Sequence, residues 1–227
     1  MIYRTEYPTG LFGVLKKCAI LLLLLAPHAC SDTPEPYPDV ITVFADVRSN
    51  AAGDLVDFTT DDGVCLLISN TNIAQHRPDT VYRAVVGYVP DEATDPTSGV
   101  SRTATVYSLT GAQLLSDSTA VLRHDAIDAE CVWAQGQYIN LQLTAKTQGA
   151  ARHCFGFATD SLTTNATVSP TFTHHHISIH HRQGDDPLSF SQTYYCSIRP
   201  SSLPAYLPGD SITVSVHTFS GIRSWSF

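Results

Sequence analysis

Residues 55–68 read Leu-Val-Asp-Phe-Thr-Thr-Asp-Asp-Gly-Val-Cys-Leu-Leu-Ile, and they carry the clearest structural signal in the chain. Two apolar runs of strand length flank Asp61-Asp62-Gly63, and an Asp-Gly pair tolerates the positive φ that tight turns need. This stretch therefore predicts a β-hairpin. On either side of it, in residues 41–47 and 82–88, apolar residues recur at every second position, which is the period of a strand with one buried face.

The same alternation continues through two blocks of the chain. Five short strands fit into residues 40–115, and this number suits a small barrel of the OB type. Further strands are predicted around residues 139–145, 152–159, 171–181, 191–198 and 212–219, a spacing typical of a β-sandwich. We therefore expect an all-β protein, with an N-terminal OB-like barrel over residues 40–115 and a C-terminal antiparallel β-sandwich over residues 124–227.

Composition and charge exclude several classes of protein. The 227 residues include 13 Lys and Arg against 21 Asp and Glu, which gives a formal net charge of −8. A nucleic-acid-binding protein needs a basic face to neutralise phosphates, so nucleic acid is not an expected partner. A single Met and 13 each of Gly and Pro also argue against a long-helix or coiled-coil protein.

The N-terminal residues resemble a targeting segment. Lys16 and Lys17 precede an apolar run, residues 18–26, that has the length of a signal-peptide core and is too short to span a bilayer. Ala29-Cys30 after this run resembles a bacterial lipoprotein processing site, so we expect residues 1–29 to be a signal peptide and Cys30 to be lipidated. Residues 30–39 are acidic and Pro-rich, which predicts an extended tether. An outer-membrane lipoprotein is expected, on the cell surface or on the periplasmic face.

The order of these features resembles the NigD-like lipoproteins of the Bacteroidota. The resemblance is carried by the acidic tether into Asp39, the Asp61-Asp62-Gly63 turn, and Trp133 with the stretch Gly136-Gln137-Tyr138-Ile139-Asn140-Leu141. It continues in His153, His181-Arg182-Gln183-Gly184-Asp185 and Pro208-Gly209-Asp210-Ser211-Ile212. The resemblance implies a lipoprotein signal, an N-terminal OB domain and a C-terminal β-sandwich. It implies no reaction.

Residues 174–181 read His-His-His-Ile-Ser-Ile-His-His and form the most conspicuous cluster of metal-ligating side chains. On a strand, His174, His176 and His180 share one face with Ser178. Two imidazoles of a His-x-His pair lie about 7 Å apart at Cα, a spacing able to chelate Zn²⁺. The alternative is a strand whose imidazoles pack without metal. A divalent-metal-binding surface lipoprotein that uses this tract is therefore the second functional hypothesis.

No catalytic motif emerges from the rest of the chain, and neither catalytic residues nor cofactors are predicted. Nucleophile elbows, phosphate-binding glycine loops and Cys-x-x-Cys are absent from the sequence. The acid pairs Asp61-Asp62 and Asp185-Asp186 fall in predicted turns, and turn chemistry accounts for them. Export makes a disulfide among Cys131, Cys154 and Cys196 one reading; in the other, these three and Cys65 are buried thiols.

The resulting functional hypothesis is a non-enzymatic envelope protein that binds a ligand or partner. The barrel block holds Phe44, Phe58, Tyr82, Tyr88 and Tyr107. OB barrels bind oligosaccharides on such surfaces, although most aromatic strand residues pack inward. A glycan or a protein is therefore the expected ligand, the membrane is reached through the lipid on Cys30, and the ligand-binding residues are left open.

Overall fold

The computed structural model describes residues 39–74, 76–91, 102–117, 123–165 and 172–227. The predicted signal peptide, Cys30 and the tether up to residue 38 lie outside these residues. Asp39–Phe227 forms one compact unit. Within the described residues, no helix has the length and apolar character needed to cross a membrane.

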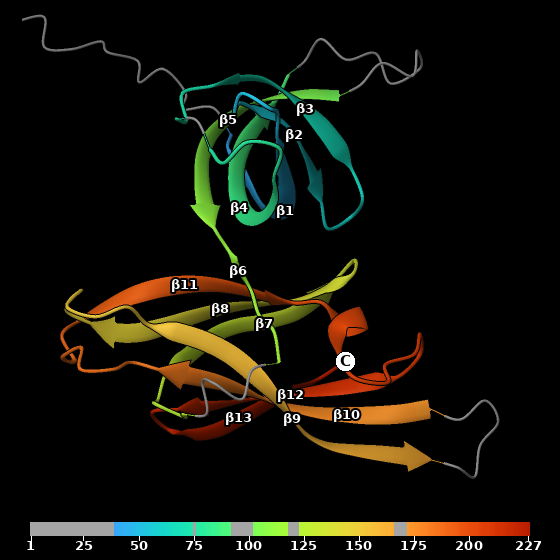
Figure 1. Cartoon of the computed structure of the whole chain (residues 1–227), viewed down its shortest axis with the longest axis vertical. Coiled ribbons are helices and arrows are strands. Elements are labelled where there is room, and N and C mark those ends of the chain that lie inside the picture. The colour runs from blue at the N-terminus through green and yellow to red at the C-terminus, as the bar shows by residue number, and fades with distance from the viewer. Residues whose placement is uncertain (1–38, 75, 92–101, 118–122, 166–171) are drawn as a thin grey trace, which may run out of the picture. The chain divides into compact units, whose positions relative to one another are not determined.

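The first five strands close into a barrel (Figure 1). They are joined in the order β1-β2-β3-β5-β4, and the parallel contact between β3 and β5 completes the ring. The predicted hairpin is present: the Gly63 N–H donates to the Thr60 carbonyl at 2.9 Å, and Gly63 adopts φ +78°. The strands are β1 (Ile41–Ser49), β2 (Leu55–Thr60), β3 (Cys65–Thr71), β4 (Val81–Pro90) and β5 (Arg102–Gly111).

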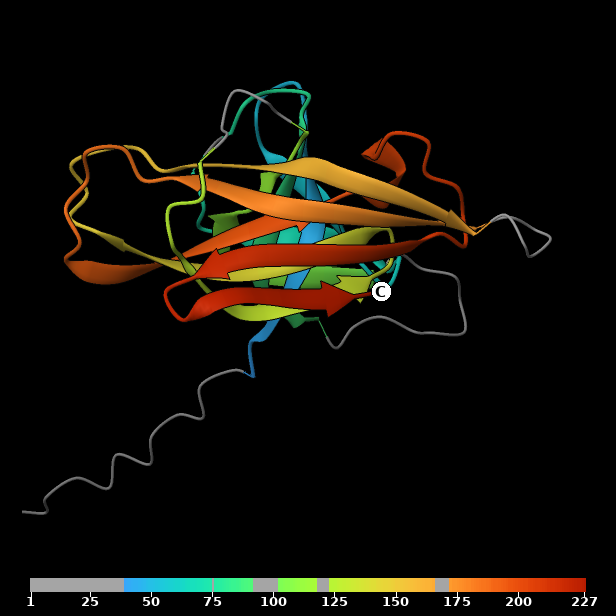
Figure 2. The ribbon, with the colours of Figure 1, turned by 90° about the horizontal axis from the view of Figure 1, so that it is seen from below.

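The remaining strands form two four-stranded sheets. One sheet has the order β13-β12-β10-β9 and the other the order β6-β11-β8-β7. In Figure 2 the gold, orange and red strands of the first sheet lie side by side. The strands are β6 (Gln113–Leu114), β7 (Asp128–Gln135), β8 (Tyr138–Thr147), β9 (Cys154–Asn165), β10 (Phe172–Arg182), β11 (Phe190–Ile198), β12 (Ser211–Thr218) and β13 (Gly221–Ser226), with a short 3-10 helix at Pro200–Ser202.

The all-β class with an OB-type barrel and a sandwich is confirmed, but the sandwich is not purely antiparallel. Strand β10 runs parallel to β12, from the pair His174↔Ser211 to the pair Ile179↔Val216. The chain leaves β10, crosses to the other sheet as β11 and returns as β12 in the original direction, which is how parallel neighbours arise. Strand β6 is also parallel to its neighbour β11.

The barrel strands end before the expected boundary at residue 115. Strand β5 ends at Gly111, and Gln113 and Leu114 already pair with Cys196 and Ser197 of the sandwich. The two-residue strand β6 therefore joins the sandwich although the sequence alternation assigns it to the barrel block. Alternation locates strands but does not say which sheet a strand joins.

Each block has its own apolar core, as the period-two pattern requires. The barrel core includes Val47, Phe58, Val86 and Val106, and the sandwich core is a larger cluster between its two sheets. Of the aromatic residues of the barrel, Phe44, Phe58 and Tyr88 are buried while Tyr107 is exposed. The sandwich core consists of the following buried residues: Leu115, Ile127, Ala129, Ile139, Leu141, Leu143, Ala145, Phe155, Phe157, Ile177, Ile179, Cys196, Ile198, Leu203, Ile212, Val214 and Val216.

Candidate functional site

A buried arginine joins the barrel to the sandwich. Arg83 on β4 contacts two barrel carboxylates, with Nη1 at 3.3 Å from Asp46 and Nη2 at 2.7 Å from Asp61. The same guanidinium reaches the sandwich, where Nε donates to Ser197 Oγ at 3.1 Å and Nη2 donates to Asn140 Oδ1 at 3.0 Å. We call Asp46, Asp61, Arg83, Asn140 and Ser197 the Arg83 cluster.

The polar groups of the Arg83 cluster also bond to one another and to the side chain of Tyr138. Asn140 Nδ2 donates to Asp61 Oδ2 at 2.6 Å, and Ser197 Oγ donates to Asn140 Oδ1 at 2.7 Å. The guanidinium lies 3.8 Å from the centre of the Tyr138 ring, and the Tyr138 hydroxyl donates to Asp46 at 2.8 Å. Burial raises the pKa of Tyr138. Charge compensation and a cation–π contact make this cluster a structural joint.

The apolar part of the joint is a trio of aromatic rings. Phe44 from the barrel meets Trp133 and Tyr195 from the sandwich edge-on, at ring-centre distances of 5.3 and 5.8 Å. A cavity of about 360 Å³ lies beside the trio, but its amides are engaged: Gln135 donates to Asp62 and Gln142 to Glu130. Few polar groups are left there to hold a ligand.

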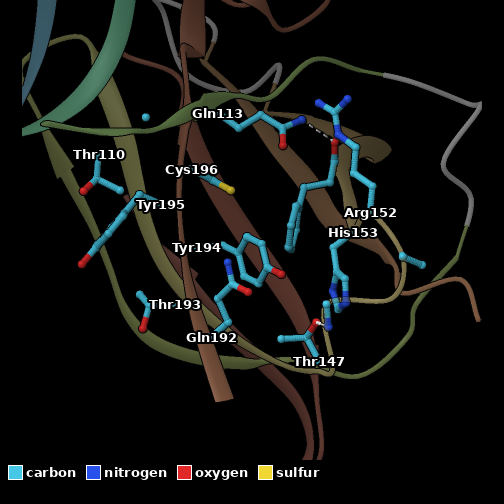
Figure 3. A pocket seen from close by; sticks show the side chains of 14 residues that line it. Thr110, Gln113, Thr147, Arg152, His153, Gln192, Thr193, Tyr194, Tyr195 and Cys196 are labelled. Atoms are coloured by element: carbon cyan, nitrogen blue, oxygen red, sulfur yellow. Dashed lines mark hydrogen bonds between the residues drawn. The ribbon is translucent and has the colours of Figure 1, made fainter. Parts of the chain in front are cut away.

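A larger cavity, of about 430 Å³, lies beside strand β11 (Figure 3). We call it the β11 pocket. Figure 3 shows Gln192, Thr193, Tyr194 and Tyr195 along one side and Arg152 and His153 on the other. Cavities of this size bind small molecules or short segments of chain. The full lining is Thr110, Gly111, Gln113, Thr147, Gly149, Ala151, Arg152, His153, Phe155, Gln192, Thr193, Tyr194, Tyr195 and Cys196.

The wall formed by His153 is part of a buried hydrogen-bond chain. His153 Nε2 lies 3.1 Å from Asp186 Oδ2, and His153 Nδ1 lies 2.9 Å from His181 Nε2. His181 Nδ1 lies 3.0 Å from the Asp125 carbonyl, which can only accept, so this nitrogen carries a proton. The side chains of His153 and Asp186 are fully enclosed. We call His153, His181 and Asp186 the buried triad.

The carboxylate of Asp186 is the best-supported group of the buried triad. The Thr147 hydroxyl and the backbone N–H groups of Ala150 and Gln148 hold the pKa of Asp186 well below its usual range. Burial lowers the pKa of His181. Both ring nitrogens of His153 and of His181 are occupied by contacts within the fold.

The buried triad makes stability depend on acid pH. Because the folded-state pKa of Asp186 is lowered, its contribution is complete above the unfolded value near 4 and is lost as the pH falls below it. We expect Asp186→Asn to be less stable than wild type at pH 7 and to lose less stability between pH 5 and 3. Urea unfolding at several pH values measures this.

The matched control is the neighbouring exposed carboxylate, in Asp185→Asn, which should follow the wild-type curve. Equal curves for the two variants would show that the lowered pKa of Asp186 does not cause the acid dependence of stability.

The five histidines of the tract, in residues 174–181, occupy four different environments, of which the buried triad holds His181. His174 lies next to His176, with ring centres 4.3 Å apart, and its two nitrogens are bonded to Ser211 and Thr213. His180 is on the same face, about 13 Å further along the strand, and packs against His124, which in turn stacks on His217. Burial lowers the pKa values of His174 and His124.

The three predicted metal ligands therefore do not lie together, because His180 is four residues further along strand β10 than His176. Among the described residues, no group of three or more His, Cys, Asp or Glu is arranged to hold a metal ion. His175 points to the core side and bonds Asp210 at 3.1 Å. The four described cysteines are free: Cys65 and Cys131 are exposed, Cys154 is half-buried and Cys196 is buried. Neither a disulfide nor a set of four buried thiols is present in this part of the chain.

The structural roles of two acidic residues, Asp61 and Asp186, were not predicted from the sequence. Turn chemistry is an incomplete explanation for the acid pairs, because Asp61 belongs to the Arg83 cluster and Asp186 to the buried triad. Arg83 gave one usable signal, since it is the single charged residue inside an apolar strand. The partners of both carboxylates come from distant parts of the sequence, which no local pattern reveals.

The comparisons with known proteins agree with this architecture. Residues 44–110 match the family model described as the NigD-like N-terminal OB domain. The barrel is thus a NigD-like N-terminal OB domain, and the resemblance drawn from the sequence is confirmed. None of the curated proteins matches the chain.

Three solved structures share the fold of the chain. A NigD-like immunity protein from Bacteroides caccae is 22% identical with a TM-score of 0.59, over 84% of this chain and 93% of that one. A putative toxin-related protein from Parabacteroides distasonis is 18% identical with a TM-score of 0.64, over 83% and 92%. A Bacteroides vulgatus protein of unknown function is 12% identical with a TM-score of 0.63, over 83% and 90%.

Proposed function

We propose that this protein is a lipid-anchored envelope protein that binds a partner and catalyses no reaction. The observation that carries the proposal is the β11 pocket, which combines about 430 Å³ of space with exposed strand residues and the cation Arg152. No ion pair of Arg152 is found among the described residues. A pocket that holds an uncompensated charge at a sheet edge suits recognition of another molecule.

The chemistry of the pocket wall favours binding over catalysis. Both nitrogens of His153 are bonded within the buried triad, so neither is free to move a proton to or from a substrate. Burial raises the pKa of the Cys196 thiol to about 12, so it is not a nucleophilic thiolate at neutral pH. The groups that could react are thus used by the fold itself.

The relatives are compatible with partner recognition. One similar structure is that of a NigD-like immunity protein and another that of a putative toxin-related protein. We extend to this chain only the recognition of a partner. The anchor is proposed from the sequence alone, from the apolar run that ends at Ala29-Cys30.

One experiment in living cells tests both parts of the proposal. Full-length protein with a photo-cross-linking residue at position 193 should give a discrete adduct, because Thr193 lines the β11 pocket. The same residue at position 224 is the control, since Ser224 lies on the edge strand β13 of the other sheet. Equal adducts at both positions, or none at position 193, would refute a partner in this pocket.

The same cells report on the anchor. A labelled fatty acid should be incorporated into wild type and into Cys65→Ala, an exposed cysteine of the barrel, but not into Cys30→Ala. Protease treatment of intact cells then separates the two membrane faces, because only a surface-displayed protein is degraded before lysis. Label that persists in Cys30→Ala would contradict the anchor.

A further inference from the structure

Strand β11 has an open edge. It pairs with β8 along its whole length, Phe190–Ile198, but on its other side β6 covers only Cys196 and Ser197. No other described strand pairs with residues 190–195 on that side. This uncovered edge is the side of β11 on which the β11 pocket opens, and Thr193 and Tyr195 line it.

The register shows which backbone groups point into the opening. Ser197 accepts a hydrogen bond from the Leu115 N–H at 2.8 Å, so its carbonyl faces the β6 side. In an antiparallel ladder, the N–H and C=O of alternate residues point to the same side. The pairing of β11 with β8 contains no bulge, so Tyr195 and Thr193 also direct both backbone groups toward the open edge.

The groove along this edge is bounded by the chain itself. Residues 113–117 cross from β11 to the edge of β9, where Asp117 bridges to Phe157, and this segment closes one end. The side-chain amide of Gln113 donates to the Phe155 carbonyl on β9 at 3.1 Å. The Gln113 amide thus donates a hydrogen bond to a backbone carbonyl of the edge strand β9, as the backbone of a bound peptide would.

The charge of the groove selects among partners. Arg152 is exposed and is the one Lys or Arg among the residues of the lining. No carboxylate lines the pocket, although the protein carries a net charge of −8. A local excess of positive charge on an acidic protein favours an anionic group on the ligand.

We propose that the β11 pocket binds an extended segment of a partner protein, which adds as a strand to β11 and pairs an acidic side chain with Arg152. The inference rests on the proposed partner-binding function and specifies the chemistry of the partner. Backbone groups of Thr193 and Tyr195 supply the hydrogen bonds common to all peptides, and Arg152 supplies the selectivity. Strand β6 is the internal precedent, because it already pairs with the same edge at Cys196, the residue that follows Tyr195.

Two substitutions of Thr193 distinguish the contribution of its backbone N–H to binding from that of its side chain. Thr193→Pro removes the N–H that points into the groove and leaves the bonds to β8 intact, which edge strands tolerate. Thr193→Ala removes the same side chain but keeps the N–H. Thermal melts of the full-length variants in detergent establish that both are folded before binding is compared.

The probe is a fluorescein-labelled, terminally blocked peptide, Thr-Val-Glu-Val-Thr-Val, followed by fluorescence anisotropy with full-length protein. We expect Thr193→Pro to weaken its binding about tenfold or more, because a backbone acceptor of the peptide loses its donor. Thr193→Ala should bind as wild type. Arg152→Gln should weaken binding about tenfold, and a peptide with Lys in place of Glu should not bind.

The outcomes distinguish this inference from the function on which it rests. Unchanged binding by folded Thr193→Pro would overturn strand addition. So would a cross-linked adduct at position 193 in cells together with no binding of the peptide, although partner binding would then stand. Peptide binding without an adduct in cells would support the edge as a strand acceptor and refute the cellular function. A wild-type dimer that Thr193→Pro dissolves, with no peptide bound, would make a second copy the occupant.

Discussion

Arg83→Met is expected to destabilise the protein by about 3–5 kcal/mol, the cost of breaking a buried ion pair by removing one partner. The substitution keeps an unbranched apolar stem but leaves Asp61, which is almost fully enclosed, without its counter-charge. It also removes the donors to Asn140 and Ser197 that tie the barrel to the sandwich. Urea unfolding followed by tryptophan fluorescence measures the loss.

The matched control is Arg48→Met. Arg48 forms a second arginine–aspartate pair of the described barrel, with Asp57; the Arg48 side chain is 59% exposed, whereas that of Asp57 is buried. Solvent reaches this pair from the arginine side, so this variant should lose clearly less stability than Arg83→Met. Similar losses in the two variants would show that the burial of Arg83 at the joint does not increase its contribution to the free energy of unfolding.

Gly136→Ala should also destabilise the protein strongly. Gly136 adopts φ +58°, where an L-residue costs about 1–2 kcal/mol. A Cβ at this position would also lie 2.1 Å from the Asp61 carbonyl oxygen, so the β7–β8 turn would have to withdraw from the barrel. Unfolding free energies from urea titrations measure the total loss.

Gly63→Ala isolates the backbone part of this effect. Gly63 also has a positive φ, +78°, in the facing turn of the barrel, but nothing lies within 4 Å of its added Cβ. We expect Gly136→Ala to exceed Gly63→Ala by about 1 kcal/mol or more, the usual range for overpacking. Equal losses of stability in the two variants would show that the close approach of Gly136 to the Asp61 backbone does not contribute to stability.

Local patterns predicted most of the strands, because alternation and turn residues act over a few positions. The hairpin at Asp61-Asp62-Gly63 and the strands around Tyr82, His176 and Val214 are examples. Strand β13 gave no such signal, because it is an edge strand with a largely exposed sequence. The parallel pairing of β10 and β12 was also hidden, since it depends on the path of β11 through the other sheet.

The site was less predictable than the fold, for a physical reason. Arg83 meets Asn140 across 57 residues of sequence and Ser197 across 114, and His153 meets Asp186 across 33. Several sequence features that carry the NigD-like resemblance, among them Asp61, Asn140 and His153, belong to these two networks, and Gly136 lies against the Asp61 backbone. They are therefore elements that hold the fold together, and the β11 pocket lies beside them.

The composition of the Arg83 cluster has a consequence for the order in which the chain assembles. Both carboxylates of the cluster, Asp46 and Asp61, belong to the barrel, as does Arg83 itself, whereas Asn140 and Ser197 come later in the chain. A barrel that emerges first during synthesis can therefore neutralise its arginine before the sandwich exists. The late strand β11 then completes the joint, supplying Ser197 and the partner of β6. The two domains can thus mature in sequence without a stage at which the arginine waits for its counter-charge.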